Sequence, residues 1–139
     1  MTSTNIESIA ADTNVLLSAV AGRAARRVFD KTELIVVTTE KNVAEVIKYL
    51  PVFGTRYGIS EELLVETLDA LPLEIYREDA YAAQIPAAAD FLAGRDDDDI
   101  ALAALALTLQ IPIWSNDRDY ERFQHGTFTT AQLLKFLQI

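Results

Sequence analysis

The stretch "GRDDDDIALAALALTLQIPIWSNDRDYERF", residues 94–123, holds the features that decide the fold. Four consecutive aspartates precede a segment that is apolar on nearly all sides, which is typical of a buried helix over residues 99–110. The "IPIWS" that follows, residues 111–115, has the pattern of a short buried strand. Aspartates at a helix start cap free N–H groups and suit the helix dipole. Capping and the helix dipole together explain Asp96, Asp97 and Asp98. They leave at least one of the four aspartates that could bind a cation.

Outward from this stretch, strand and helix patterns alternate along the chain. Strands are predicted to end near Asp12 and to span residues 33–39, 72–76, 111–115 and 126–130. Helices are predicted over residues 15–20, 24–30, 40–50, 60–71, 77–93 (with a break at Pro86), 99–110 and 130–139. Such alternation predicts an α/β fold: a three-layer α/β/α sandwich around a mainly parallel sheet of about five strands.

Two helices carry more specific expectations. Thr39 can cap the helix over residues 40–50, in which Val43, Val46, Ile47 and Leu50 have the spacing of a buried stripe, and Pro51 and Gly54 are predicted to end it. On a helical wheel of residues 40–50, Glu45 lies opposite this buried stripe. Lys41 and Lys48 flank it at ion-pairing distance along the helix, so a solvated face explains Glu45 as well as a catalytic role does. Ser60 is expected to open the next helix with a capping box.

Composition limits the class of protein. The chain has 139 residues, half of them hydrophobic, and we interpret residues 1–139 as one domain. No apolar run reaches the length of a membrane span, and the first residues lack the pattern of a signal peptide. The chain has no cysteine, which excludes disulfides and thiolate metal sites and fits a cytoplasmic protein.

The charge balance argues against a nucleic-acid partner at first sight. The chain has 21 Asp and Glu against 12 Lys and Arg, for a net charge of −9, whereas phosphate binding needs cationic side chains. Acids that hold a cation would weaken this objection. A second point is that Arg23, Arg26, Arg27 and Lys31 lie close together, either as backbone contacts or as an ordinary exposed helix face.

Acidic and polar residues recur where the predicted strands end. Asp12, Thr13 and Asn14 follow the first strand, and Ser115, Asn116, Asp117 and Asp119 follow the fourth. The aspartates at 96–99 open the helix that leads into that fourth strand. Because parallel strands place their carboxyl ends at one edge, these acids should meet there. The candidate ligands are hard oxygen atoms, and the chain has no Cys and a single His, His125. The sequence therefore indicates Mg²⁺ or Mn²⁺ and not zinc.

Taken in order, these acids resemble the PIN-domain nucleases, which include the VapC-type toxins. The matching segments are "ADTNVLL" (11–17), "VAEV" (43–46), "DIALAALAL" (99–107) and "IWSNDRDYE" (113–121). Each single motif is weak, but four in order across nearly the whole chain are a strong signal. Asp117 follows Asp99 by 18 residues, the length that a helix, a turn and a strand require. Leu102 stands where the family usually has Ile.

The resemblance implies hydrolysis of RNA phosphodiesters with one or two divalent ions, Mg²⁺ or Mn²⁺. As partners it implies a protein antitoxin and a second copy of the chain in a homodimer. It implies catalytic roles for Asp12, Glu45, Asp99 and Asp117. Asp12, Asp99, Asp117 and Asp119 would be metal ligands, with Asp98 in reserve for Asp99. The candidates for substrate contacts are Thr13, Asn14, Ser115, Arg23, Arg26 and Arg27.

Two other functions remain open at this point. One is a PIN-like module that binds RNA or a protein without cutting, although all four acids are present. The other is a Mg²⁺-dependent phosphate-accepting α/β domain. An aspartyl phosphatase of that kind has a second acid at the position of Asn14. A receiver domain has a Lys directly after a late strand, and this chain has none there. A purely structural acidic protein would leave the clustering of the acids unexplained.

Overall fold

The structure, a computed structural model, describes residues 6–93 and 97–139. Asp96 therefore lies outside the described residues. The centre of the fold is a five-stranded parallel sheet, with strand order β3-β2-β1-β4-β5. Across the sheet the strands are β3 (Leu73–Tyr76), β2 (Ile35–Thr39), β1 (Ser8–Ala11), β4 (Ile113–Trp114) and β5 (Thr127–Phe128). The expected mainly parallel sheet is thus confirmed, and it is parallel throughout.

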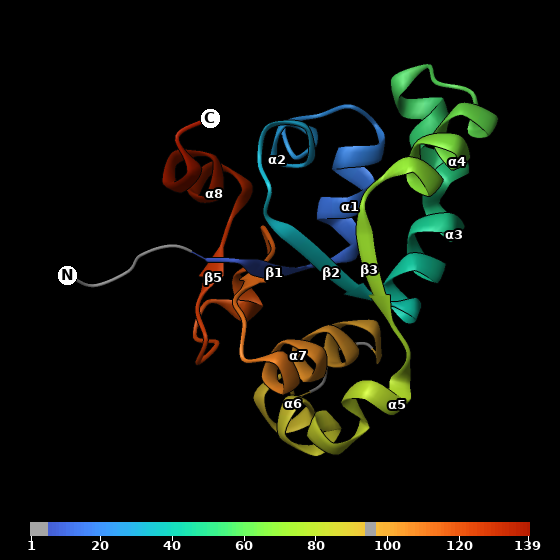
Figure 1. Cartoon of the computed structure of the whole chain (residues 1–139). Helices are drawn as coiled ribbons and strands as arrows, with labels where there is room; N and C mark the ends of the chain where they lie inside the picture. Colours follow the sequence, from blue (N-terminus) through green and yellow to red (C-terminus); the bar gives the residue numbers. More distant parts are fainter. Residues whose placement is uncertain (1–5, 94–96) are drawn as a thin grey trace.

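Helices cover both faces of this sheet, which makes the predicted three-layer sandwich (Figure 1). One face carries α1 (Thr13–Val20), α2 (Arg26–Lys31), α3 (Glu40–Tyr57), α4 (Glu61–Ala70) and α8 (Thr130–Leu137). The other carries α5 (Glu78–Tyr81), the 3-10 turn η1 (Ala82–Gln84), α6 (Ile85–Phe91) and α7 (Asp97–Leu109). A second 3-10 turn, η2 (Arg118–Tyr120), follows β4.

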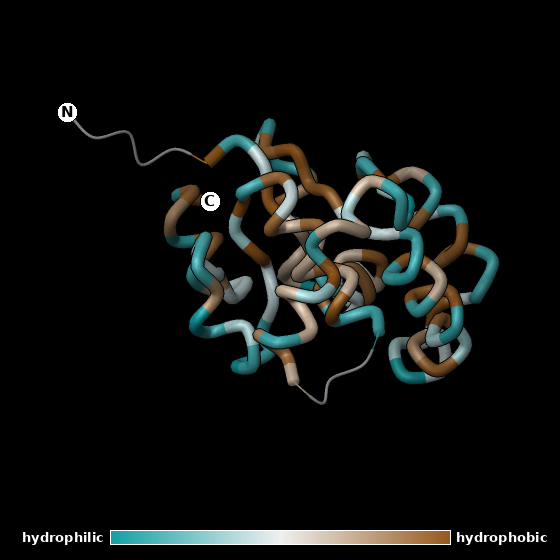
Figure 2. The backbone as a smooth tube through the Cα atoms, turned by 90° about the horizontal axis from the view of Figure 1, so that it is seen from below, coloured by the Kyte–Doolittle hydropathy of each residue, from teal (hydrophilic) through white to brown (hydrophobic). Residues whose placement is uncertain are grey.

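The buried strands divide their side chains between two cores. Ile9, Ala11 and Trp114 pack with α1 to α4 and α8, whereas Ala10 and Ile113 pack against α7. Successive strand residues point to opposite faces, so an all-apolar strand serves both layers. In Figure 2 the outer helices α3 and α4 alternate between hydrophobic and hydrophilic stretches, as amphipathic helices do. α7, by contrast, is buried over residues 101–106, as its sequence predicts.

The expected end of the third helix is wrong. α3 continues through Pro51 and ends at Gly58, whose φ of 66° is the left-handed conformation that favours glycine. Pro51 removes the N–H that would bond the carbonyl of Ile47, but both residues are exposed, so water can reach that carbonyl. Gly54 allows a close approach, because a Cβ there would lie 2.7 Å from the carbonyl oxygen of Ile59.

Helix caps follow the sequence in part. Thr39 caps α3, and the Ser60 hydroxyl accepts from the N–H of Leu63 at the start of α4. The third position of α4 is Leu63, which has no acceptor, so Ser60 makes a single cap and the predicted capping box is wrong. The reciprocal box is formed by Thr129 and Gln132 at α8. Pro86 is the second residue of α6, so the predicted break lies at the start of that helix.

Candidate active site

Asp12 is the most deeply placed of the acids. It directly follows β1 and caps α1, where its Oδ1 accepts from the N–H of Val15 at 2.9 Å, and its other oxygen accepts from the hydroxyl of Ser115. Its side chain is only 6% exposed. Burial raises the pKa of Asp12 to about 6, against the lowering by the hydrogen bonds from Ser115 and Val15; Asp99 and Asp117 raise it further. This site therefore places a negative charge where the surroundings disfavour it.

Ser115 links Asp12 to the segment after β4. The two segments are neighbours because β1 and β4 pair in parallel, with Ala11 opposite Trp114. Ser115 is buried, and while its hydroxyl donates to Asp12, its oxygen accepts from the N–H of Asp117 at 2.9 Å. One hydroxyl thus positions both the Asp12 carboxylate and the backbone that carries Asp117.

The acids of α7 enter from the other side of the sheet. α7 begins at Asp97, which is exposed in its first turn, where an aspartate suits the helix dipole as expected. The phenol of Tyr120 donates to Asp99 Oδ1 at 3.1 Å. Thr13 Oγ1 donates to Asp98 Oδ2 at a long 3.5 Å. Burial and the nearby Asp99 raise the pKa of Tyr120, so its phenol stays a donor.

Asn42 connects α3 to the start of α1. It is buried, and its Nδ2 donates to Thr13 Oγ1 at 3.1 Å while its Oδ1 accepts from the hydroxyl of Thr39 at 2.6 Å. Thr13 in turn reaches Asp98. A chain of hydrogen bonds therefore runs from the carboxyl end of β2 to the start of α7, and it fixes the floor beside Asp12.

Glu45 does not lie on the face of α3 that the sequence analysis expected. The buried residues of α3 are Asn42, Val46, Leu50 and Gly54, and Ile47 is 53% exposed. The buried face is thus rotated around the helix, because Asn42 buries its amide against Thr39 and Thr13. Glu45 consequently lies beside the buried face and is half-buried. Lys41, one of its expected ion-pair partners, pairs with Glu78 at 2.9 Å.

These elements enclose a cavity of about 450 Å³ at the carboxyl ends of β1 and β4. Its acids come from four segments of the chain and are Asp12, Glu45, Asp98, Asp99 and Asp117. Thr13 and Asn14 add polar atoms at the start of α1. The α3 side chains Tyr49, Val52, Phe53 and Arg56, together with Leu17 of α1, complete the wall.

Other predicted residues lie outside this lining. Ser115 is buried behind Asp12, and Asp119 is exposed, with its N–H donating to Asp117 Oδ1 at 2.8 Å. Arg26 is engaged elsewhere: its guanidinium donates to the carbonyl oxygens of Ala19 (2.7 Å) and Val20 (3.1 Å) at the end of α1.

The remaining two arginines differ from each other in their surroundings. Arg23 lines a second cavity, which adjoins the first. Arg27 is exposed on α2 and lines none of the cavities that the structure describes around the acids. The structure therefore brings Arg23, and neither Arg26 nor Arg27, next to the acidic cavity.

The acids share a cavity without forming a tight cluster. Among residues 6–93 and 97–139, no three acidic or imidazole side chains lie close enough to make a ready-made metal site. Carboxylates of like charge repel, and Asp12 and Asp99 are each held by hydrogen bonds to their own surroundings. The donors nevertheless fit Mg²⁺ or Mn²⁺ chemically, because they are carboxylate, hydroxyl and amide oxygens with no thiolate or imidazole among them.

Sequence reasoning missed Asn42, Tyr120 and Arg56 at this site. Asn42 and Tyr120 act on Thr13 and Asp99 through contacts across 29 and 21 residues, respectively, which no local pattern reveals. One signal was available for Asn42: a polar residue three positions after a helix cap, on the face of Val46 and Leu50. Arg56 lies beyond the helix end that Pro51 and Gly54 predict, so the sequence pattern gives no reason to expect it at this site.

The parallel sheet and the acidic cavity at its carboxyl edge define an α/β protein with an acid-lined site at the position where open parallel sheets bind ligands. A family model of the PIN domain matches residues 10–135, and the chain belongs to this family, whose members are generally nucleases. No curated protein matches the chain. Among the described residues, no helix has the length and apolar character to cross a membrane.

Proposed function

We propose that this protein is a divalent-metal-dependent endoribonuclease that hydrolyses RNA phosphodiester bonds. The observation that supports it best is the arrangement of three aspartates: Asp12 after β1, Asp99 on α7 and Asp117 after β4 line the same cavity. Glu45 lines that cavity from α3. Asp12 and Asp117 also cap the elements that follow them, but such local caps do not require four segments to bring their acids to one cavity.

Asp12, Asp99 and Asp117 would hold Mg²⁺ or Mn²⁺. When bound, such an ion would supply a Lewis acid for the phosphodiester and its developing negative charge. A cation would also offset the burial and the smaller carboxylate repulsion that raise the pKa of Asp12. Asp98 shares the lining and remains the alternative to Asp99, whereas Asp119 is exposed and would act only as an accessory acid.

The other side chains hold these groups in place or meet the substrate. Ser115 orients Asp12, and Tyr120 orients Asp99, through the hydrogen bonds they donate. Glu45 is the acid on α3, and as a half-buried carboxylate it can accept a proton from water or orient it. Thr13 and Asn14, which line the cavity at the start of α1, would contact a phosphate oxygen.

The choice of RNA and the biological setting rest on the resemblance to VapC-type PIN proteins. We extend the proposal accordingly to a toxin of a toxin–antitoxin pair, acting in the cytoplasm as a homodimer with a protein antitoxin. A small neighbouring gene whose product co-purifies with this chain supports that setting. Size-exclusion chromatography with light scattering measures the oligomeric state.

The decisive test is cleavage of single-stranded RNA by the wild type and by Asp12→Asn, with Mg²⁺, with Mn²⁺ and with EDTA. We expect cleavage only by the wild type with metal. Asp69→Asn is a matched control, because Asp69 is an exposed acid on α4, and it should cleave as the wild type does. Cleavage that survives both the Asp12 substitution and EDTA contradicts the mechanism. Absence of cleavage and of metal binding in the wild type favours a binding module.

A further inference from the structure

A second cavity, of about 490 Å³, adjoins the acidic one. Asn14 of α1 and Phe53 and Arg56 of α3 line both, so the two cavities share a wall between these helices. Ser18 lies four residues after Asn14, about 6 Å further along α1, and lines the second cavity but not the first. The second cavity therefore extends the site by a distance on the scale of one nucleotide.

The lining of this second cavity has the opposite charge. It contains Arg23 and Arg56 and no acid, whereas the first cavity contains five acids and one arginine. Each guanidinium lies over an aromatic ring of α3: Arg23 is 5.1 Å from the ring centroid of Tyr57, and Arg56 is 5.2 Å from that of Phe53. Two cations that line one cavity are thus each held against a ring, next to the acidic cavity.

The two guanidiniums remain able to bind an anion. Contact with a ring uses the face of a guanidinium and leaves its in-plane N–H donors for a ligand. Within the part of the chain that the structure describes, neither Arg23 nor Arg56 forms a side-chain hydrogen bond or an ion pair, and both are exposed. Arg26 shows the contrast, since its donors are used by the carbonyl oxygens of Ala19 and Val20.

Asn116 adds a neutral donor to the same cavity. Its Oδ1 accepts from the N–H of Thr130 at 2.9 Å, which fixes the orientation of the amide. The NH₂ group at the other end of the amide is then the part left for a ligand. Asn116 follows Ser115, so this donor and the support of Asp12 come from the same short segment after β4.

An RNA strand needs such a site because each nucleotide carries one negative charge. A metal ion among the acids offsets charge at the scissile phosphate, but the next phosphate would meet only carboxylates unless a cation lies nearby. We propose that Arg23 and Arg56, with Asn116, bind the phosphate next to the scissile one on the substrate strand. This inference rests on the proposed function, because it takes the ligand to be the RNA that enters the acidic cavity.

The test measures binding of a fluorescent single-stranded RNA by anisotropy in EDTA, with cleavage measured separately in Mg²⁺. The proteins are the wild type, Arg23→Ala, Arg56→Ala, the double variant and Lys135→Ala. Lys135 is an exposed cation near the end of α8, beside residues that line a cavity at the opposite edge of the sheet, so it controls for net charge. Thermal melts show that each variant is folded.

We expect the double variant to bind RNA about tenfold or more weakly, since hydrogen bonds between charged groups are among the stronger ones. Each single variant should lose part of this. The slope of log affinity against log salt should fall by about 0.7 for the lost phosphate contact, and Lys135→Ala should change neither quantity. Wild-type-like binding by the double variant, an equal loss in Lys135→Ala, or no RNA binding by the wild type overturns the inference.

The two proposals fail in different ways. A wild type that binds RNA through the arginines but does not cleave it leaves this inference standing and contradicts the proposed nuclease. A wild type that cleaves, with the double variant equal to it in both affinity and KM, overturns only the phosphate site. If the arginine variants instead lose a co-purifying protein and keep RNA binding, the surface binds protein and this inference is overturned.

Discussion

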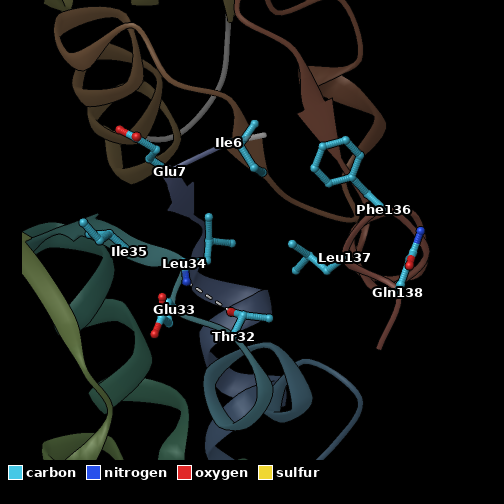
Figure 3. A pocket seen from close by; sticks show the side chains of 9 residues that line it. All are labelled: Ile6, Glu7, Thr32, Glu33, Leu34, Ile35, Phe136, Leu137 and Gln138. Carbon is cyan, nitrogen blue, oxygen red and sulfur yellow. Dashed lines mark hydrogen bonds between the residues drawn. The ribbon is translucent and has the colours of Figure 1, made fainter. Parts of the chain in front are cut away.

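The two edges of the central sheet each carry a cavity, and they differ in what lines them. At the carboxyl edge, about 450 Å³ are surrounded by five acids from four segments. At the amino edge, a larger cavity of about 730 Å³ lies between the starts of β1 and β2 and the end of α8 (Figure 3). Its ionisable side chains are Glu7 and Glu33. The cavity that collects acids from several segments is therefore the smaller of these two.

The difference follows from how the strands end. At the carboxyl edge, Asp12 and Ser115 follow paired strands and contact each other across 103 residues. At the amino edge, the hydrogen bond that Figure 3 shows is local, from Leu34 N–H to the hydroxyl of Thr32 at 3.3 Å, and it shapes a turn. Convergence of charged groups from distant segments, more than cavity size, is our reason for proposing the carboxyl edge as the reactive one.

Asp99→Asn is the most direct test of the difference between the two edges, and its expected effect is the largest. Asn keeps the size of the side chain and can still accept from Tyr120, but it removes one negative charge from the acidic cavity. We expect RNA cleavage to fall by more than the roughly 10- to 100-fold that is typical of losing a group behind a metal ligand. Single-turnover cleavage at saturating Mg²⁺ measures this.

Asp98→Asn is the matched comparison for Asp99, because the two acids are neighbours on α7 and line the same cavity. We expect its loss to be smaller. A larger loss in Asp98→Asn than in Asp99→Asn would assign the metal to Asp98 and reverse the order of the two residues.

Ser115→Ala tests the contact between the strand ends. The change leaves one Asp12 oxygen and the N–H of Asp117 without their hydroxyl partner. We expect a decrease in metal affinity or activity of about 10- to 100-fold, with the fold retained. Isothermal titration with Mn²⁺ and a cleavage assay measure the two quantities. Thr67→Ala on α4 is the control, since the Thr67 hydroxyl bonds only a carbonyl within its own helix.

How much of this site follows from the sequence depends on the range of the contacts involved. The shared edge of Asp12 and Asp117 could be predicted, because parallel strands align their carboxyl ends and each acid follows a strand that is visible as an apolar run. The PIN-domain family was likewise recognisable from four short motifs. Both depend on local patterns in a fixed order.

The contacts that orient the site could not be predicted in this way. The position of the buried face of α3 depends on Asn42. This residue packs inward because its amide donates to the Thr13 hydroxyl and accepts from the Thr39 hydroxyl. The spacing of the apolar residues predicts a buried face that includes Val43 and Ile47, because Asn42 is polar and does not belong to an apolar stripe. Pro51 predicts a helix end because its missing N–H is costly in a buried helix, but exposure on α3 removes most of that cost.

The acidic edge should also cost stability, and pH shows how much. The pKa of Asp12 is about 6 when folded, against an ordinary value of 3.8. Between these values the folded chain holds more protons than the unfolded chain, so stability falls as pH rises from about 4 to 6. At pH 7 in EDTA, Asp12→Asn should therefore be more stable than the wild type, by about 1–3 kcal/mol.

Urea denaturation of both proteins from pH 4 to pH 7 measures this difference. The advantage of Asp12→Asn should disappear near pH 4, where Asp12 is protonated in the folded chain. A constant difference across that range would mean that the substitution acts through the cap of α1, where Oδ1 accepts from Val15, and not through the charge.

The smallest expected effect is at the amino edge. Glu33→Gln removes a carboxylate from the cavity of about 730 Å³, where Glu33 is exposed. We expect RNA cleavage to stay within about twofold of the wild type, because exposed charges at the far edge of the sheet are screened by salt over about 10 Å. Cleavage at low and moderate salt measures it. A loss comparable to that of Asp99→Asn would show that the larger cavity takes part in the reaction, and that the contrast between the two edges does not locate the site.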